Sequence, residues 1–283
     1  MTKIITIIKL VAFFALLGYP PVLKAQAWTK AKNSGFYKLD FTRVASSLVF
    51  DTYGEVLPFR PTSNHTFSIY GEYGITDKFT LLAYVPVLVA NRFAESKNPA
   101  GVVLPAVKES SFGDVDLSFR YQIYNKKGIS ASINALFGLP TGNAKQADGL
   151  WTGDGEFNQM VKIAAGTGKI KWWTQGAIGF NNRTNRYSDE FRYDFEFGYK
   201  FLNARLLAIF KINGIESLNN GTARENSVGL YANNVEFGGF GPEILYYVSQ
   251  KKNTGVSFRL GRSFKGRNVL GGPSFSFGVF TQL

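Results

Sequence analysis

Charged side chains that recur at every second position are the feature of this sequence best suited to act on another molecule. In the segment EFRYDFEFGYKF, residues 190–201, Arg192, Asp194, Glu196 and Lys200 alternate with aromatic residues. Successive side chains of an extended chain point to opposite sides, so the charges share one face and the rings share the other. A charged row of this kind can bind or select a solute, or its members can pair with one another.

The same pattern in other segments defines a set of candidate residues for a solute path. These residues carry both signs of charge and belong to the polar faces of alternating segments: Lys38, Asp40, Glu72, Asp114, Asp116, Arg120, Arg192, Asp194, Glu196, Lys200 and Arg259. Around a narrow interior the charges would pair with one another and fill it, whereas around a wide interior they would select solutes. The sequence leaves both interpretations open.

Few residues are suited to catalysis or to metal binding. The chain has no cysteine, which excludes disulfides, thiolate metal sites and cysteine nucleophiles. Its single histidine, His65, is close in sequence to Asn64 and Ser68, but nothing that resembles the signature of a lipid-hydrolysing enzyme surrounds them. The segment 141–156 has acidic residues among glycines, at a spacing that differs from a calcium-binding loop. We expect no enzyme activity, no metal and no cofactor.

The first residues are typical of an exported protein. Lysines precede a short apolar run, and small residues follow at Ala25 and Ala27. This order indicates a secretory signal peptide, and the apolar run is too short for a membrane-spanning helix. We expect residues 1–27 to form the signal peptide, with cleavage after Ala25 or after Ala27 fitting equally well, and residues 28–283 to form one domain.

The elements that must position the charged rows are strands. Beyond the signal peptide the hydrophobic pattern has a period of two, and a helical period never persists. The pattern predicts roughly 12 strands of about ten residues each. Their expected positions are 36–50, 66–75, 79–90, 114–124, 129–139, 157–166, 170–180, 190–201, 204–213, 235–248, 255–264 and 271–283. Pro86 cannot donate to a ladder, so it predicts a bulge or a distorted strand end.

The connections between these strands alternate between long and short. Long ones such as 91–111 and 140–156 follow the odd-numbered strands, and short ones such as 76–78 and 125–128 follow the even-numbered strands. A barrel inserted into a membrane from one side has this arrangement, with short turns in the periplasm and long loops outside. A soluble sandwich has no reason to sort its loops in this way. We therefore expect an all-β fold, a transmembrane up-and-down antiparallel β-barrel whose termini are both periplasmic.

The aromatic faces of the strands need a cover, and the sequence provides no second layer of elements for them. Lipid can cover them, and a closed sheet leaves no unpaired backbone edge in hydrocarbon. The charged faces would then line the interior. Loss of Lys3, Lys9 and Lys24 with the signal peptide lowers the formal net charge from +12 to +9, which suits anionic lipid head groups, anionic solutes or nothing specific. No nucleic-acid-binding motif is recognisable.

Four motifs occur in order along most of the mature chain: GITDKFTLLAYVP at 74–86, SFGDVDLSFRYQI at 111–123, LFGLPTGN at 136–143 and GRNVLGGPSFSFGVF at 266–280. Together they resemble the outer-membrane barrel family that is named for the meta-cleavage pathway of phenol degradation, a relative of larger fatty-acid and aromatic-hydrocarbon channels. The resemblance implies a passive channel for small, apolar or aromatic compounds in the outer membrane of a Gram-negative bacterium. The closing FSFGVFTQL is also similar to the terminal strand that barrel assembly machinery reads, although Leu283 stands where an aromatic residue is commoner.

The segment 91–111 is the expected gate of this channel. The larger fatty-acid channels carry an N-terminal hatch, whereas here only about ten residues separate the signal peptide from the first strand. A gate must then come from a loop or from lumen side chains. Folded into the mouth, the apolar centre of this loop would form a constriction made by Val102, Val103, Leu104 and Val107. The alternative is a loop that is disordered or faces lipopolysaccharide.

These observations combine into a monomeric channel for a small solute. Its expected partners are outer-membrane lipid and lipopolysaccharide, the barrel assembly machinery and the solute, with no nucleic acid. Two alternatives from other classes remain. One is a barrel enzyme that acts on lipid around His65, and the other is a non-conducting structural barrel whose long loops bind a partner.

Overall fold

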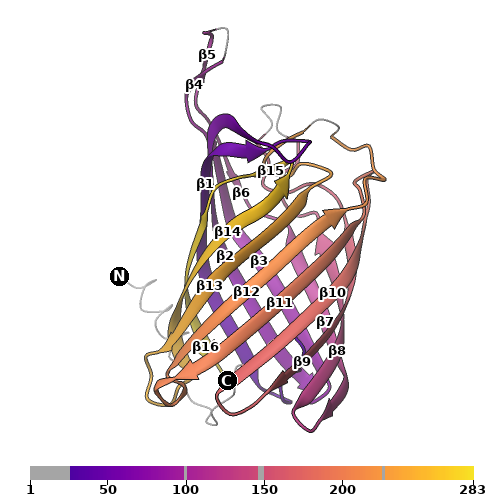
Figure 1. Cartoon of the computed structure of the whole chain (residues 1–283), viewed down its shortest axis with the longest axis vertical. Helices are drawn as coiled ribbons and strands as arrows, with labels where there is room; N and C mark the ends of the chain where they lie inside the picture. The colour runs from indigo at the N-terminus through magenta and orange to yellow at the C-terminus, as the bar shows by residue number, and fades with distance from the viewer. Residues whose placement is uncertain (1–25, 99–100, 146–149, 225–226) are drawn as a thin grey trace, which may run out of the picture.

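Twelve long antiparallel strands close into a barrel in the computed structural model, which describes residues 26–98, 101–145, 150–224 and 227–283 (Figure 1). This confirms the predicted fold class. The strands are β1 (Gly35–Phe50), β2 (Val56–Thr76), β3 (Phe79–Phe93), β7 (Val115–Lys126), β8 (Ile129–Leu139), β9 (Asn158–Gly168), β10 (Trp172–Arg183), β11 (Glu190–Phe201), β12 (Leu206–Ser217), β13 (Glu236–Tyr247), β14 (Thr254–Arg267) and β16 (Ser274–Gln282).

The first and last long strands pair with each other and close the barrel. Phe41 of β1 lies opposite Phe67 of β2 on one side and opposite Phe277 of β16 on the other. Each remaining strand pairs with its sequence neighbours among the long strands. Closure leaves no sheet edge with unpaired backbone groups, which is the condition for a sheet to cross hydrocarbon.

The outer face of the barrel is apolar at mid-height. Ile133, Ile163 and Ile178 lie side by side on β8, β9 and β10, and all three side chains are exposed on the outside of the sheet. Their neighbours along each strand face the lumen, because side chains alternate. Lipid therefore meets the rows of rings and branched chains, and the polar faces line the interior. Among the residues described, no helix is long and apolar enough to cross a membrane.

One predicted boundary moves because the hairpin of β1 and β2 is longer than expected. The segment 51–63 was expected as a loop, but β2 already begins at Val56 and pairs with the upper part of β1. The turn is closed by Asp51, whose carboxylate accepts the backbone N–H of Tyr53 and of Glu55, both at 2.8 Å. The predicted bulge beside Pro86 is present, because the register between β2 and β3 shifts between Phe67 and Ser68, where Pro86 pairs.

The segment 91–111 is built of short strands and projects away from the barrel. β3 continues to Phe93 and pairs with β6 (Val107–Ser111), while β4 (Ser96–Lys97) and β5 (Val103–Leu104) form a separate ladder. Figure 1 shows β4 and β5 above the rim. β15 (Val269–Leu270) extends β1 on the same side of the barrel, and the 3₁₀ turn η1 (Leu202–Ala204) is a short connection at the opposite end.

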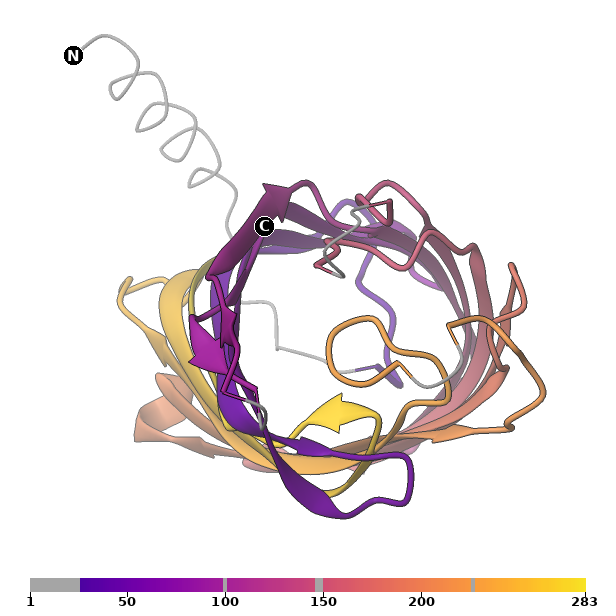
Figure 2. The ribbon, with the colours of Figure 1, turned by 90° about the horizontal axis from the view of Figure 1, so that it is seen from above.

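The residues that precede β1 lie inside the barrel, which the sequence analysis did not predict. The segment 26–34 occupies the end of the lumen where the short turns lie, and Figure 2 shows it within the ring of strands. Ala27, Thr29 and Lys30 are all buried there. The sequence analysis considered only loops and lumen side chains as occupants of the lumen, and this segment adds a third. About ten residues are too few for a hatch domain, but they suffice to fill part of a narrow barrel.

Candidate functional site

The periplasmic part of the lumen is closed by an apolar cluster. It combines the N-terminal segment with inward-facing side chains from six strands: Ala27, Trp28, Phe36, Ala164, Trp173, Ala177, Leu207, Ile209, Leu245, Tyr247 and Phe280. Phe36 stacks on Phe280 at a centroid distance of 5.7 Å, and Tyr247 meets the same ring edge-on at 5.2 Å. The cluster acts as a small hydrophobic core inside the barrel.

Polar groups of the wall bind the backbone of the N-terminal segment. Arg120 donates to the carbonyl of Trp28 at 2.9 Å, Ser130 donates to the carbonyl of Ala27 at 2.6 Å, and the amide of Ala27 donates to Gln175 at 2.9 Å. These bonds satisfy backbone groups that would otherwise be buried without partners. Arg120 and Glu72, both predicted for the solute path, thus help to hold the segment: Glu72 lies 3.6 Å from Arg120 and 3.6 Å from Lys30.

A layer of charges lies at mid-height on one side of the lumen. Lys38 of β1 contacts Asp40 at 2.9 Å and Glu243 of β13 at 3.3 Å. Lys211 of β12 contacts Glu243 at 2.5 Å and Glu196 of β11 at 3.7 Å. These pairs join four strands, so much of the charge in this layer is neutralised by other side chains of the barrel wall.

The other predicted lumen charges are distributed along the barrel. Asp194 pairs with Lys162 at 2.6 Å, and Asp116 faces a neighbouring cavity of 240 Å³. Arg192 pairs with Glu190 at 2.6 Å near the outer end. Lys200 lies over the ring of Trp173 with its ammonium 5.8 Å from the centroid, near the periplasmic end.

Asp114 is the one predicted solute-path residue that stands outside a strand, just before β7. Its carboxylate accepts the backbone N–H groups of Gly142 and Asp154 at 2.8 and 2.9 Å, and so holds one extracellular loop. Burial raises the pKa of this carboxyl to about 6.

Sequence reasoning missed three lumen charges, Lys162, Lys211 and Glu243. Each is the single charged residue in the middle of its strand, as Lys211 is in the stretch LLAIFKIN of β12. A single charge does not produce a visible row. The parity of the outward residues Phe210 and Ile244 would have placed Lys211 and Glu243 on the inner face.

Cavities remain between the charged layer and the two ends of the barrel. One cavity, of 540 Å³, lies toward the outer end and is lined by residues of β1, β2, β12, β13 and β14 together with the connection before β13. A second, of 300 Å³, lies toward the N-terminal segment. Lys211 and Arg259 line both, so they stand at the junction of the two spaces.

The loop between β12 and β13, and not the segment 91–111, folds into the outer mouth. Figure 2 shows this orange loop within the ring of strands. Tyr231 donates to the carbonyl of Thr152 at 2.9 Å, and the guanidinium of Arg224 lies 3.7 Å from the ring centroid of Trp151. By contrast, Val102 and Val103 of the predicted gating loop are 57% and 51% exposed. Together with Leu104 and Val107 they belong to the β4–β6 segment that starts from the rim of β3.

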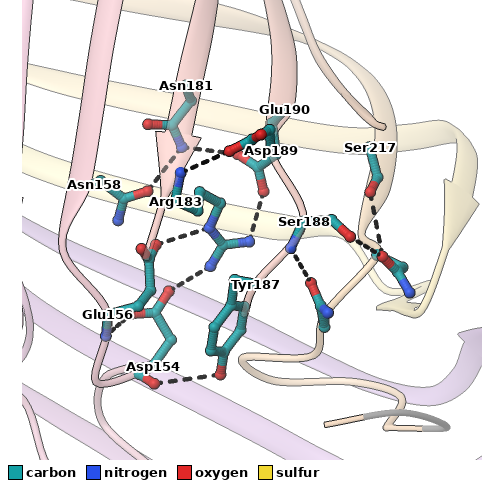
Figure 3. A network of polar contacts seen from close by, with 12 residues as sticks. Asp154, Glu156, Asn158, Asn181, Arg183, Tyr187, Ser188, Asp189, Glu190 and Ser217 are labelled. Atoms are coloured by element: carbon teal, nitrogen blue, oxygen red, sulfur yellow. Dashed lines mark hydrogen bonds and ion pairs between the residues drawn. The ribbon is translucent and has the colours of Figure 1, made fainter. Parts of the chain in front are cut away.

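A buried arginine network lies at the mouth beside this loop (Figure 3). Arg183 contacts Asp154 and Glu156 at 2.7 Å each and Glu190 at 2.8 Å. Burial raises the pKa of Glu156 to about 7, although Arg183 acts in the opposite direction. The folded protein therefore binds the Glu156 proton more tightly than the unfolded chain, in which the pKa is the usual 4.5. The stabilising contribution of this proton is complete below about 4.5 and is lost as the pH rises through about 7.

Comparison with protein families identifies the chain. The profile of the family described as "Putative MetA-pathway of phenol degradation" matches residues 52–278, which covers most of the sequence. The chain belongs to this family. Sequence comparison with curated proteins gives no match.

Solved structures share the fold of this chain. An outer-membrane channel from Pseudomonas putida F1 is similar with a TM-score of 0.66 and 11% identity, over 93% of this chain and 100% of that chain. The NanC porin is similar with a TM-score of 0.53 and 9% identity, over 87% of this chain and 100% of that chain. At these identities the likeness shows the shared barrel fold.

The fold also places the protein in a membrane. A closed antiparallel barrel with an even number of strands and an apolar outer belt is the architecture of bacterial outer-membrane proteins. The outward row of Ile133, Ile163 and Ile178 would be unfavourable in water, since large exposed apolar patches mark a lipid or protein contact. The protein is therefore a barrel of the Gram-negative outer membrane.

The residues considered for catalysis and metal binding do not come together in the structure. His65 stacks on the outward ring of Phe41 at 6.1 Å, whereas Ser68, three residues further along β2, is buried on the inner face. A hydrolase needs the histidine beside the nucleophile. In the part of the chain that is described, no group of three or more acidic or histidine side chains is placed to hold a metal, and Asp148 lies outside the described residues.

Proposed function

We propose that the protein is a passive channel through which a small solute crosses the outer membrane. The observation that supports this most directly is the pair of cavities of 540 and 300 Å³ that adjoin at Lys211 and Arg259 inside the barrel. A barrel that served only as a scaffold could fill this space with side chains, as narrower barrels do. The proposal extends to the lumen residues named above as the walls of the solute path.

The walls of the path indicate a solute with an apolar part. Val44, Leu230, Tyr231 and Leu270 line the outer cavity, and Phe36, Tyr70, Trp173 and Leu245 line the inner one. Apolar and aromatic linings with a few placed polar groups are typical of sites for small organic molecules. We include aromatic compounds in the solute class, in agreement with the name of the family.

The N-terminal segment 26–34 is the proposed gate of this channel. It is bound through hydrogen bonds to Arg120, Ser130 and Gln175, and it covers the inner cavity on the periplasmic side. Hydrogen bonds to a short segment can be exchanged for water without disturbing the barrel wall, because the wall strands pair independently of it. The barrel would act as a monomer, and the barrel assembly machinery would read β16 during insertion.

Planar-bilayer recording of the purified mature protein in potassium chloride tests the channel. Discrete current steps, together with swelling of liposomes in small uncharged solutes, are the expected result. The same N-terminal segment favours a second candidate, a non-conducting structural barrel with partner-binding loops. Bilayers that contain correctly folded protein yet carry no current, and liposomes that do not swell, would establish that candidate and remove the first.

A further inference from the structure

The outer cavity has an unusual charge composition for this lumen. Of its charged lining residues, Lys211 and Arg259 face the lumen, whereas Arg262 is exposed and shares the outward parity of Phe258 and Leu260. No aspartate or glutamate is among the residues that line the cavity. The inner cavity differs, since Asp40, Glu72, Glu196 and Glu243 all face it. An organic anion that enters from outside would thus meet basic side chains before it meets any carboxylate.

Among the described basic side chains that face the middle of the lumen, Arg259 has no carboxylate within 4.0 Å. Glu243 lies directly opposite Arg259 on β13. The carboxylate of Glu243 is already bound by Lys211 at 2.5 Å and by Lys38 at 3.3 Å. Among the described residues, the Arg259 guanidinium donates one hydrogen bond, to the hydroxyl of Ser276 at 3.1 Å.

The other basic residues at mid-lumen differ from Arg259 in this respect. Lys38, Lys162 and Lys211 each lie within 4.0 Å of a carboxylate, as does Arg120 nearer the periplasm. A guanidinium carries five N–H donors in a planar fork that matches a carboxylate, and one serine hydroxyl satisfies only one of them. In the described part of the lumen, Arg259 therefore has donors to spare at the edge of the outer cavity.

The remaining walls of the cavity fit an apolar body. Val44, Val235, Leu270 and the ring of Tyr231 contribute apolar surface, while Asn64 and Thr66 of β2 add hydrogen-bonding groups. A volume of 540 Å³ lies within the range of sites that hold small organic molecules. The cavity thus combines one forked cation with walls suited to a ring or a branched chain.

We propose that the outer cavity binds a small organic carboxylate with an aromatic or branched apolar body, and that Arg259 binds its carboxylate group. This inference rests on the proposed channel and names its substrate class. A neutral compound would leave the spare donors of Arg259 without a charged acceptor, and a cation would be repelled by Lys211 and Arg259. The carboxylate–guanidinium pair is charge-assisted and can be bidentate, which makes it stronger than a neutral hydrogen bond.

Isothermal titration of the purified barrel in a non-ionic detergent tests the site, with sodium benzoate as the probe and benzyl alcohol as its uncharged counterpart. We expect benzoate to bind about tenfold or more tightly than benzyl alcohol, because a hydrogen bond to a charged group is worth about 1.5–3 kcal/mol. The Arg259→Gln variant should lose this preference. The matched control is Arg43→Gln, which removes the same charge from an exposed position on the outer face of β1.

Three results would overturn the site: equal binding of benzoate and benzyl alcohol to the wild type, unchanged benzoate binding by Arg259→Gln, or an equal loss in Arg43→Gln. Heat-modifiable migration on a gel shows whether each variant is folded. If Arg259→Gln does not fold, the comparison of benzoate with benzyl alcohol on the wild type still tests whether the cavity prefers a carboxylate. Bilayer conductance in potassium chloride is recorded in parallel, so that binding without current refutes the channel, and current without selective benzoate binding refutes the site.

Discussion

Arg183 connects three carboxylates that come from one extracellular loop and the start of a neighbouring strand. Asp154 and Glu156 belong to the loop after β8, and Glu190 is the first residue of β11. The side chain of Arg183 is 7% exposed, and that of Glu156 is fully buried. In such surroundings a carboxylate that loses its cation keeps most of its desolvation cost.

The Arg183→Gln substitution should therefore destabilise the protein by about 3–5 kcal/mol, the usual cost of breaking a buried ion pair on one side. Urea unfolding in lipid vesicles, followed by tryptophan fluorescence, measures this. The control is Arg186→Gln in the same connection, because Arg186 is exposed. A similar, small effect of both substitutions would mean that the network does not hold the mouth together.

At the scale of elements, the loop that folds into the outer mouth is a different one from the loop that the sequence indicated. The apolar segment 91–111 forms strands that extend the β3 edge upward, whereas the polar loop between β12 and β13 folds into the mouth. Residues 26–34 fill the periplasmic end of the lumen. Both segments that lie inside the barrel form hydrogen bonds with residues of the inner wall or of other loops. Such partners are required because buried polar groups must be hydrogen-bonded.

Removal of the N-terminal segment should increase the conductance of the channel. A chain refolded from residue 34 onward loses Trp28 from the apolar cluster and frees the space beside Arg120 and Gln175. Single-channel recording measures the change. As a control, replacement of the β4–β5 hairpin by a short Gly-Ser turn should leave the conductance as it is, because the hairpin stands above the rim (Figure 1). If the truncated barrel conducts no better than the full chain, the segment is not the gate.

For the whole molecule, lipid replaces the second layer that a soluble sheet protein would need. The outward side chains at mid-height are isoleucine, valine and phenylalanine on neighbouring strands, and the inward ones are polar, charged or small. Closure of the sheet and burial of its outer face in hydrocarbon depend on each other, because an open edge in lipid would carry unsatisfied backbone groups.

The Ile163→Arg substitution tests this directly. Ile163 lies at the middle of β9 with 55% of its side chain exposed on the outer face, so a charge there must enter the hydrocarbon. We expect a loss of about 2–4 kcal/mol in the free energy of folding into vesicles, and about 0–1 kcal/mol for Phe191→Arg near the outer end of β11. Equal costs at the two depths would contradict the proposed position of the membrane.

The local pattern of the sequence determined the wall of the barrel. Strand positions, the side of each residue and the sorting of short turns to one end follow from the period of two and from turn residues, both of which act over a few positions. For that reason β8 and β11 begin and end where the pattern predicts, and Lys38, Asp194 and Glu196 face the lumen.

The contents of the lumen were decided only by the tertiary structure. Arg259 lacks a carboxylate partner because Glu243 is bound by Lys38 and Lys211, which come from strands far apart in the sequence. The position of residues 26–34 likewise depends on Arg120, Ser130 and Gln175, which meet only after the barrel has closed. Pairing across a closed interior is a property of distances in space, and no spacing along the chain carries that information.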